Sequence, residues 1–219
     1  MKTSMALKTL LGAASLALPL MALAESNVQT GAATNAPGAT AHVDFSIVIP
    51  KILFLRVGTG ATYPGSLTGT APPLSNVVGI DGIVFTATPA TLGTGPLAGT
   101  GGDLTGGVVT AAIVSNSGNV TLSASSLGAL SDGPPANDTI SYAQITTAAT
   151  SNTTATVLPA PILADGASLN TLINAPASKV IVQDAKWTYK YANGAIVPAG
   201  TYGGVNQNNS RVTYTATMP

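Results

Sequence analysis

The clearest alternation of apolar and polar residues lies at His42–Val57, HVDFSIVIPKILFLRV. Its first half places apolar side chains at every second position: Val43, Phe45, Ile47 and Ile49. Because successive side chains of a strand point to opposite faces, this pattern predicts a β-strand with one buried face. Pro50 has no backbone N–H to donate to a sheet, so we expect a kink within a long first strand.

Further alternating or β-branched runs predict strands along the rest of the chain. They are Val77–Thr88, Val108–Ser115, Asn119–Ser125, Thr139–Thr147, Lys179–Tyr191 and Arg211–Met218, with two short and ambiguous segments at Thr154–Leu163 and Ser168–Ile173. Asp81-Gly82 and Asn116-Ser117-Gly118 predict hairpin turns, and Asn193-Gly194 is a further turn signal. About eight or nine strands without an amphipathic helix predict an all-β fold, a single β-sandwich of Greek-key or immunoglobulin-like type.

The first residues predict export. Lys2 and Lys8 precede or flank an apolar run that ends on Ala22-Leu23-Ala24, a small-residue cleavage pattern. A charged start, an apolar stretch and a small-x-small end are typical of a bacterial secretory signal peptide, here residues 1–24. The run is short for a transmembrane helix, so no stable membrane insertion is expected. The mature protein is expected in the periplasm or at the cell surface.

The next residues, 25–41, are rich in Ala, Thr, Asn and Gly and predict a flexible leader. The sandwich domain is expected to occupy residues 42–219. Two stretches dense in Gly or Pro, Gly58–Ser75 and Pro89–Gly107, predict long loops.

The charge content is unusual for a folded domain. Charged residues make up 7% of the chain, against about a quarter in an average protein. Without Lys2 and Lys8, six basic and eight acidic residues remain, a formal charge of −2. This balance argues against nucleic acid as a partner, which requires a clustered basic face. The absence of cysteine removes thiol catalysis and cysteine-bound metals.

The sequence offers little material for catalysis. His42 is the single histidine and precedes the first strand, where a solvated residue is the simpler interpretation than a catalytic base. Most acidic residues lie in predicted turns, so paired carboxylates for glycoside hydrolysis are disfavoured. Calcium could use Asp132, Asn137 and Asp138, but no spaced calcium motif is present. We therefore expect no enzyme, no cofactor and no metal site.

Trp187, Tyr189 and Tyr191 alternate within a predicted strand and so share one face. An exposed row of this kind could stack on sugars. A buried row would belong to the core, which is the favoured interpretation.

Three segments resemble fimbrial-type exported proteins, the group of pilus subunits and spore-coat-U-like domains. They are VIPKILFLRVGTG near the start, NSGNVTLSAS in the middle, and VPAGTYGGVNQNNSRVTYTATMP at the end, which contains Pro198–Tyr202 and Arg211–Pro219. Many proteins of this group carry a disulfide, whereas this chain has no cysteine.

The resemblance implies assembly by strand exchange, in which a subunit that lacks one strand receives a strand from a periplasmic chaperone and then from the next copy. Within 25–41 only Val28 is a large apolar residue, so the donor role falls on Val43, Phe45, Ile47 and Ile49. A domain that begins after Pro50 would follow.

Two functions remain open from the sequence. The first is a fimbria-like or surface-matrix subunit that acts through strand pairing. The alternative is a binding module for a glycan or protein, which would use the two long loops or the Trp187 row. A hydrolase is the least supported interpretation.

Overall fold

The computed structural model describes residues 26–33, 38–58 and 78–219. The chain divides into two units, Met1–Ile49 and Pro50–Pro219. The predicted signal peptide, most of the loop Gly58–Ser75 and part of the leader lie outside the described residues. The part that is described contains no helix long and apolar enough to cross a bilayer.

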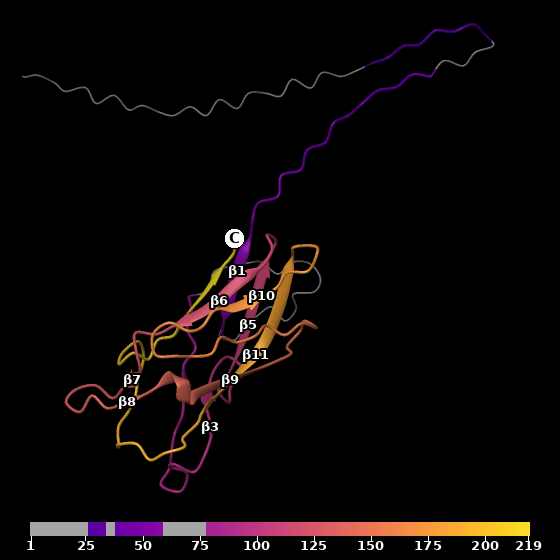
Figure 1. Ribbon diagram of the computed structural model, residues 1–219. Helices are drawn as coiled ribbons and strands as arrows, with labels where there is room; N and C mark the ends of the chain where they lie inside the picture. Colours follow the sequence, from indigo (N-terminus) through magenta and orange to yellow (C-terminus); the bar gives the residue numbers. More distant parts are fainter. Residues whose placement is uncertain (1–25, 34–37, 59–77) are drawn as a thin grey trace, which may run out of the picture. The chain divides into compact units, whose positions relative to one another are not determined.

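The second unit is all-β and antiparallel, as the sequence predicts (Figure 1). Its largest sheet contains β1 (Leu53–Val57), β5 (Val108–Ser115), β11 (Ile181–Tyr191), β3 (Leu97–Ala98) and β9 (Ile145–Thr150). β5 lies between β1 and β11. β9 pairs with the opposite edge of β11, since Lys186 faces Thr110 on one side and Thr150 on the other.

The second sheet has the order β10-β6-β12, with β10 at Thr171–Ile173, β6 at Val120–Ser125 and β12 at Thr213–Thr217. Two small pairs complete the described strands: β2 (Ile83–Val84) with β4 (Thr100–Gly101), and β7 (Leu130–Ser131) with β8 (Thr139–Ile140). A short 3-10 helix, Tyr142–Gln144, precedes β9.

Both sheets contribute to one core. The register of β5 with β11 turns Trp187 and Ile113 inward, and β6 adds Leu122 from the other sheet. Trp187 also donates a hydrogen bond from Nε1 to the Leu158 carbonyl at 2.9 Å. A buried indole N–H needs such a partner, so this bond fixes the ring at the centre of the core.

The predicted first strand is too long. Residues 42–52 form no strand, and β1 begins only at Leu53. The Pro50 ring cannot join a ladder, and the Ile52 N–H donates to the side chain of Asn116 at 2.8 Å. The segment before Pro50 therefore belongs to the first unit rather than to the sheet.

The hairpin predictions are wrong. Asn116-Ser117-Gly118 connects β5 to β6, but these strands lie in different sheets because both edges of β5 are occupied by β1 and β11. After Asp81-Gly82, β2 pairs with the distant β4 instead of with a neighbouring strand.

The structure divides one predicted strand and resolves one ambiguous segment. The 3-10 helix divides the predicted strand Thr139–Thr147 into β8 and β9. Thr154–Leu163 forms no strand. It contributes one isolated bridge, Val157 with Asp184, and the buried Leu158.

The glycine-rich stretch Gly99–Gly107 allows two backbones to approach closely. A Cβ on Gly107 would lie 2.8 Å from the Cα of Gly99, a distance that real side chains do not adopt. Gly107 also has a positive φ of 74° and donates its N–H to the Gly101 carbonyl. The glycines therefore serve the packing of β4 against the start of β5.

Gly107→Ala should lower the free energy of unfolding by about 3 kcal/mol or more, because it adds a backbone clash to the strain of a positive φ. Gly106→Ala is the matched control: its φ is 64°, and nothing lies within 4 Å of the added Cβ. This control should cost about 1 kcal/mol. Thermal or urea unfolding measures both. Equal losses would contradict the close approach.

Candidate functional site

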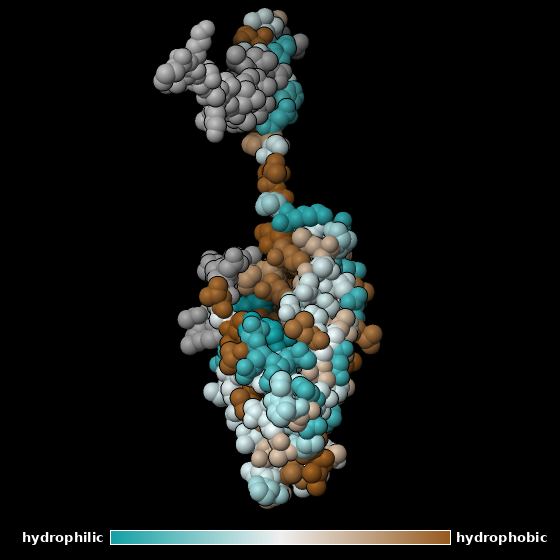
Figure 2. All heavy atoms as spheres, turned by 90° about the vertical axis from the view of Figure 1, so that its left-hand side faces the viewer, coloured by the Kyte–Doolittle hydropathy of each residue, from teal (hydrophilic) through white to brown (hydrophobic). Residues whose placement is uncertain are grey.

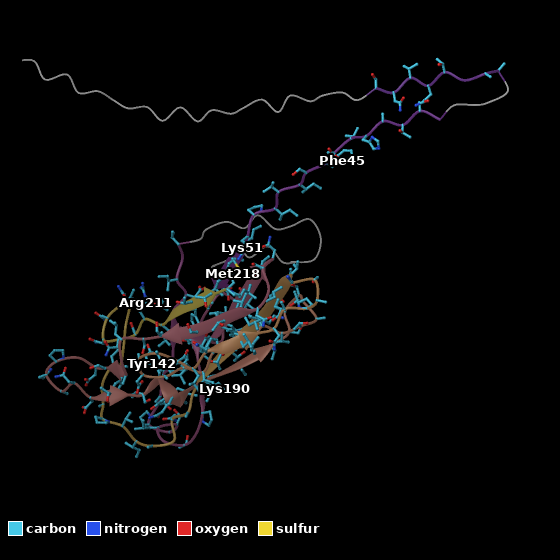
Figure 3. The ribbon with its side chains drawn as sticks, turned by 45° about the horizontal axis from the view of Figure 1, so that its top comes forward. Phe45, Lys51, Tyr142, Lys190, Arg211 and Met218 are labelled. Atoms are coloured by element: carbon cyan, nitrogen blue, oxygen red, sulfur yellow. The ribbon has the colours of Figure 1, made fainter. Side chains whose placement is uncertain are left out.

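The segment before Pro50 exposes a row of large apolar side chains. Val43, Phe45, Ile47 and Ile49 are exposed by 74%, 89%, 85% and 74%. Figure 2 shows hydrophobic atoms in brown along this narrow segment, and Figure 3 labels Phe45 on it. Folded chains rarely leave contiguous apolar surface uncovered, so this row is a candidate contact surface.

Asn116 holds the residues that connect this segment to β1. Its Nδ2 donates to the Pro50 carbonyl at 2.8 Å, and its Oδ1 accepts from the Ile52 N–H at 2.8 Å. The Asn116 N–H also donates to the Ile52 carbonyl at 3.4 Å. Because Leu53 pairs with Ser115, these bonds continue the β1–β5 register beyond the end of the sheet. We call this arrangement the Asn116 clamp.

The second unit begins and ends at the same place. Lys51 Nζ donates to the Pro219 carbonyl at 3.3 Å, and Lys51 lies near Met218 in Figure 3. The C-terminus accordingly lies beside the start of β1 in Figure 1. β1 and β12 therefore run alongside one another in opposite directions.

No hydrogen-bonded ladder joins β1 to β12. Within the described residues β1 pairs with β5 and β12 pairs with β6, which leaves one edge of each strand open. We call the region between them the β1–β12 seam. It is lined by apolar side chains that contact the core but are only partly buried: Leu53, Leu55, Val57, Tyr214, Ala216 and Met218. The seam thus combines open backbone edges with an incompletely covered core.

The aromatic row is part of the core. Trp187, Tyr189 and Tyr191 are all buried, so none presents a ring face on which a sugar could stack. Tyr189 Oη lies 2.8 Å from Tyr214 Oη, and the rings of Trp187 and Tyr214 are 5.4 Å apart. Burial raises the pKa of Tyr189 and raises that of Tyr214 to about 12. The row therefore reaches the seam from the inside, through Tyr214.

Asp184 is a buried carboxylate on the opposite face of β11. It accepts hydrogen bonds from the N–H groups of Thr153 at 2.9 Å and Thr154 at 2.8 Å, from both threonine hydroxyls, and from Asn152 Nδ2 at 3.0 Å. Burial alone raises the pKa of Asp184, but the bonds from Thr153 and Thr154 outweigh it and hold the pKa below its ordinary value. These contacts tie the segment after β9 to the sheet.

The predicted loop Pro89–Gly107 contains the short strands β3 and β4, and its residues before β3 are held from within. The Asn193 side chain, fully buried, donates to the carbonyls of Thr91 at 2.7 Å and Gly95 at 2.9 Å, and accepts from the Gly93 N–H at 3.0 Å. Its φ of 45° explains why a turn-forming residue stands there. These polar groups bond to one another, so they form an internal brace for the loop.

The remaining candidates for chemistry are His42 and the acidic residues of the predicted turns. His42 is exposed in the first unit. Asp103 accepts from the backbone N–H of Thr110 at 2.8 Å and so anchors a loop. Across the described ranges, no three His, Cys, Asp or Glu side chains are placed to hold a metal ion, Asp132 and Asp138 included.

The sequence pattern indicates the apolar row but not the polar residues that hold distant segments together. It predicts turns at Asn116 and Asn193 and a strand that contains Asp184. Their partners lie far away in the chain, so no local spacing signals the contacts.

Comparison of the chain with protein-family models, with curated proteins and with solved structures found no match.

Asp184→Asn should reduce the free energy of unfolding at neutral pH by about 2–3 kcal/mol, because an amide cannot accept the charge-assisted bonds from Thr153 and Thr154. The pKa of the wild-type carboxyl is lowered in the folded state. Its contribution is therefore complete above the ordinary pKa of an aspartate and is lost as the pH falls through the folded value.

The difference between wild type and Asp184→Asn should accordingly shrink in acid. Urea unfolding between neutral pH and about pH 3 tests this expectation. A constant difference over the whole range would show that the carboxylate charge contributes nothing.

Proposed function

We propose that the protein is an exported structural subunit that assembles with copies of itself by strand pairing. In this assembly, His42–Ile49 of one copy occupies the β1–β12 seam of the next. The observation that supports the proposal is the match between an exposed alternating apolar strand sequence and an open seam of apolar side chains in the same chain. The fold is then a β-sandwich of immunoglobulin-like or Greek-key type that lacks one edge strand.

The backbone of the segment His42–Ile49 can form the hydrogen bonds that the open edges of the β1–β12 seam offer. A strand in the seam could bond to β1 on one side and to β12 on the other, which is recognition by β-augmentation. β1 and β12 each contain five residues. Val43 to Ile49 spans about 20 Å when extended, a length that covers either strand.

The side chains match as well. Inserted with Phe45 facing inward, the segment would turn Val43, Ile47 and Ile49 toward the core and Asp44 and Ser46 toward solvent. Full burial of such side chains contributes about 1.5–3 kcal/mol each, so the four supply roughly 6–12 kcal/mol before the cost of ordering the segment. Backbone hydrogen bonds to β1 and β12 would add to this contribution.

The Asn116 clamp favours a neighbouring copy over the same copy. To fill its own seam, the chain would have to reverse direction between Ile49 and Leu53. That reversal would displace Pro50 and Ile52 from Asn116 and break two hydrogen bonds of 2.8 Å. A chain that enters β1 without this reversal keeps both bonds, so insertion into a second molecule is favoured.

The resemblance to fimbrial-type proteins supports the same proposal, and so does the predicted signal peptide. An open seam would be prone to aggregation during export. A periplasmic chaperone that supplies a temporary strand would protect it, and the final location would be the periplasm or the cell surface.

Phe45→Asp should abolish assembly, because it would place a charge in the apolar seam. Ser46→Asp is the matched control: it adds the same charge to the same segment, on the face that would point to solvent. Size-exclusion chromatography and negative-stain electron microscopy of the purified proteins measure the polymer. Polymers that survive Phe45→Asp, or are lost equally in both variants, would exclude this mode of assembly.

Asn116→Ala should allow the segment to fold back into its own seam. Removal of two hydrogen bonds worth about 1 kcal/mol each would raise the ratio of closed monomer to polymer roughly tenfold or more. Ser117→Ala, in the same turn, leaves the clamp intact and should not change the ratio. Size-exclusion chromatography at a fixed protein concentration measures the ratio of closed monomer to polymer. An unchanged ratio in a folded Asn116→Ala protein would show that the clamp does not select the partner.

A further inference from the structure

β9 presents a second open edge, on the side of the main sheet away from the β1–β12 seam. One edge of this six-residue strand pairs with β11, from Lys186↔Thr150 to Tyr191↔Ile145. Within the described chain no strand pairs with its other edge, and residues 146–150 make no backbone hydrogen bond outside the pairing with β11. One set of N–H and C=O groups therefore points outward.

The edge lacks the features that normally prevent pairing. Proteins protect edge strands with charged residues, proline, bulges or short length. β9 has the sequence ITTAAT and contains none of these residue types. No charged residue occurs between Asp138 and Asp165. The side chains of Thr146, Ala148 and Thr150 are small and exposed on one face of the sheet. The two threonine hydroxyls donate to the carbonyls of Lys190 and Lys186 on β11.

The other open edges of the two main sheets differ from β9. β1 and β12 lie beside one another across the seam. β10 has only three residues. β9 is thus the longest edge that remains available once the seam is filled.

We infer that β9 pairs with β9 of a second copy, antiparallel and about a two-fold axis at Ala148. In this register Ala148 faces Ala148 and Thr146 faces Thr150 of the partner copy. Threonine pairs directly opposite one another stabilise antiparallel strands, and no like charges meet. The two main sheets then form one continuous sheet across both copies.

The charged residues described nearest to this contact lie on β11, one strand away from the paired edges. Lys190 lies opposite Thr146 and Lys186 opposite Thr150, both on β11 rather than on the edge. Across the paired strands, Lys190 of one copy and Lys186 of the other are three strand spacings apart, about 14 Å. This exceeds the screening length of about 8 Å at physiological salt, so their repulsion is small.

A single β9 pair is weak, because two six-residue edges bury far less than the roughly 1,200 Å² of a stable interface. Many such contacts along two polymers act together and become strong. The inference about lateral bundling therefore rests on the proposed function, whereas pairing of two isolated copies does not.

The first test uses the full chain with Phe45→Asp, which prevents strand exchange, and measures sedimentation velocity from micromolar to millimolar concentration. Reversible dimerisation is expected. Adding Ala148→Lys should abolish the dimer, because two lysines would meet at the axis. Adding Ala136→Lys, at an exposed position in the turn between β7 and β8, should leave the dimer intact. No dimer at any concentration, or equal effects of the two lysines, would overturn the inference.

The second test compares polymers of the otherwise unchanged chain by electron microscopy. Ala148→Lys should give single fibres where the wild type gives bundles, and Ala148→Thr should preserve the bundles. Bundles that persist in Ala148→Lys would contradict the inference without affecting strand exchange. Absence of polymers in every variant would instead contradict the proposed function, and the dimer measured in the first test would still decide whether β9 pairs.

Discussion

The register between β5 and β11 determines most of the structure. Eight residue pairs align Val108–Ser115 with Ile181–Thr188, and this alignment sends Trp187 and Ile113 inward. The same register places Asp184 on the opposite face, where the Thr153–Thr154 segment covers it. A shift by one residue would exchange the faces, burying Asp184 in the apolar core and exposing Trp187. β1 pairs with β5 and β9 pairs with β11, so the positions of these two outer strands depend on the same register.

The open strand edges of this protein are distinguished by where they lie rather than by charged side chains. With 7% charged residues, the chain cannot place a lysine or glutamate on each exposed strand. Two open edges instead adjoin one another at the β1–β12 seam, and the residues that lead into β1 are held by Asn116. In the proposed assembly, these edges are the contact surfaces.

The sequence predicted the elements whose information is local. β5 and β11 are long, β-branched or aromatic runs, and the structure confirms both within two residues. The alternation of Val43 to Ile49 was recognised, but alternation cannot tell whether a strand finds its partner within the same chain. The role of Asn116 could not be predicted, because it depends on β1 and the β5–β6 connection meeting in space. Asp184 and Asn193 belong to the same class of contact between distant residues.

The absence of a hairpin between β5 and β6 has a kinetic consequence. Strands that adjoin in the main sheet come from distant parts of the chain, as in β1 with β5 and β5 with β11. Large loops must close before such pairs form, and chains dominated by non-local contacts fold on the slow scale of about milliseconds to seconds. During that interval, apolar strands remain unpaired and are exposed to wrong partners. A requirement for folding assistance would therefore arise from the topology itself, even if the finished subunit never polymerised.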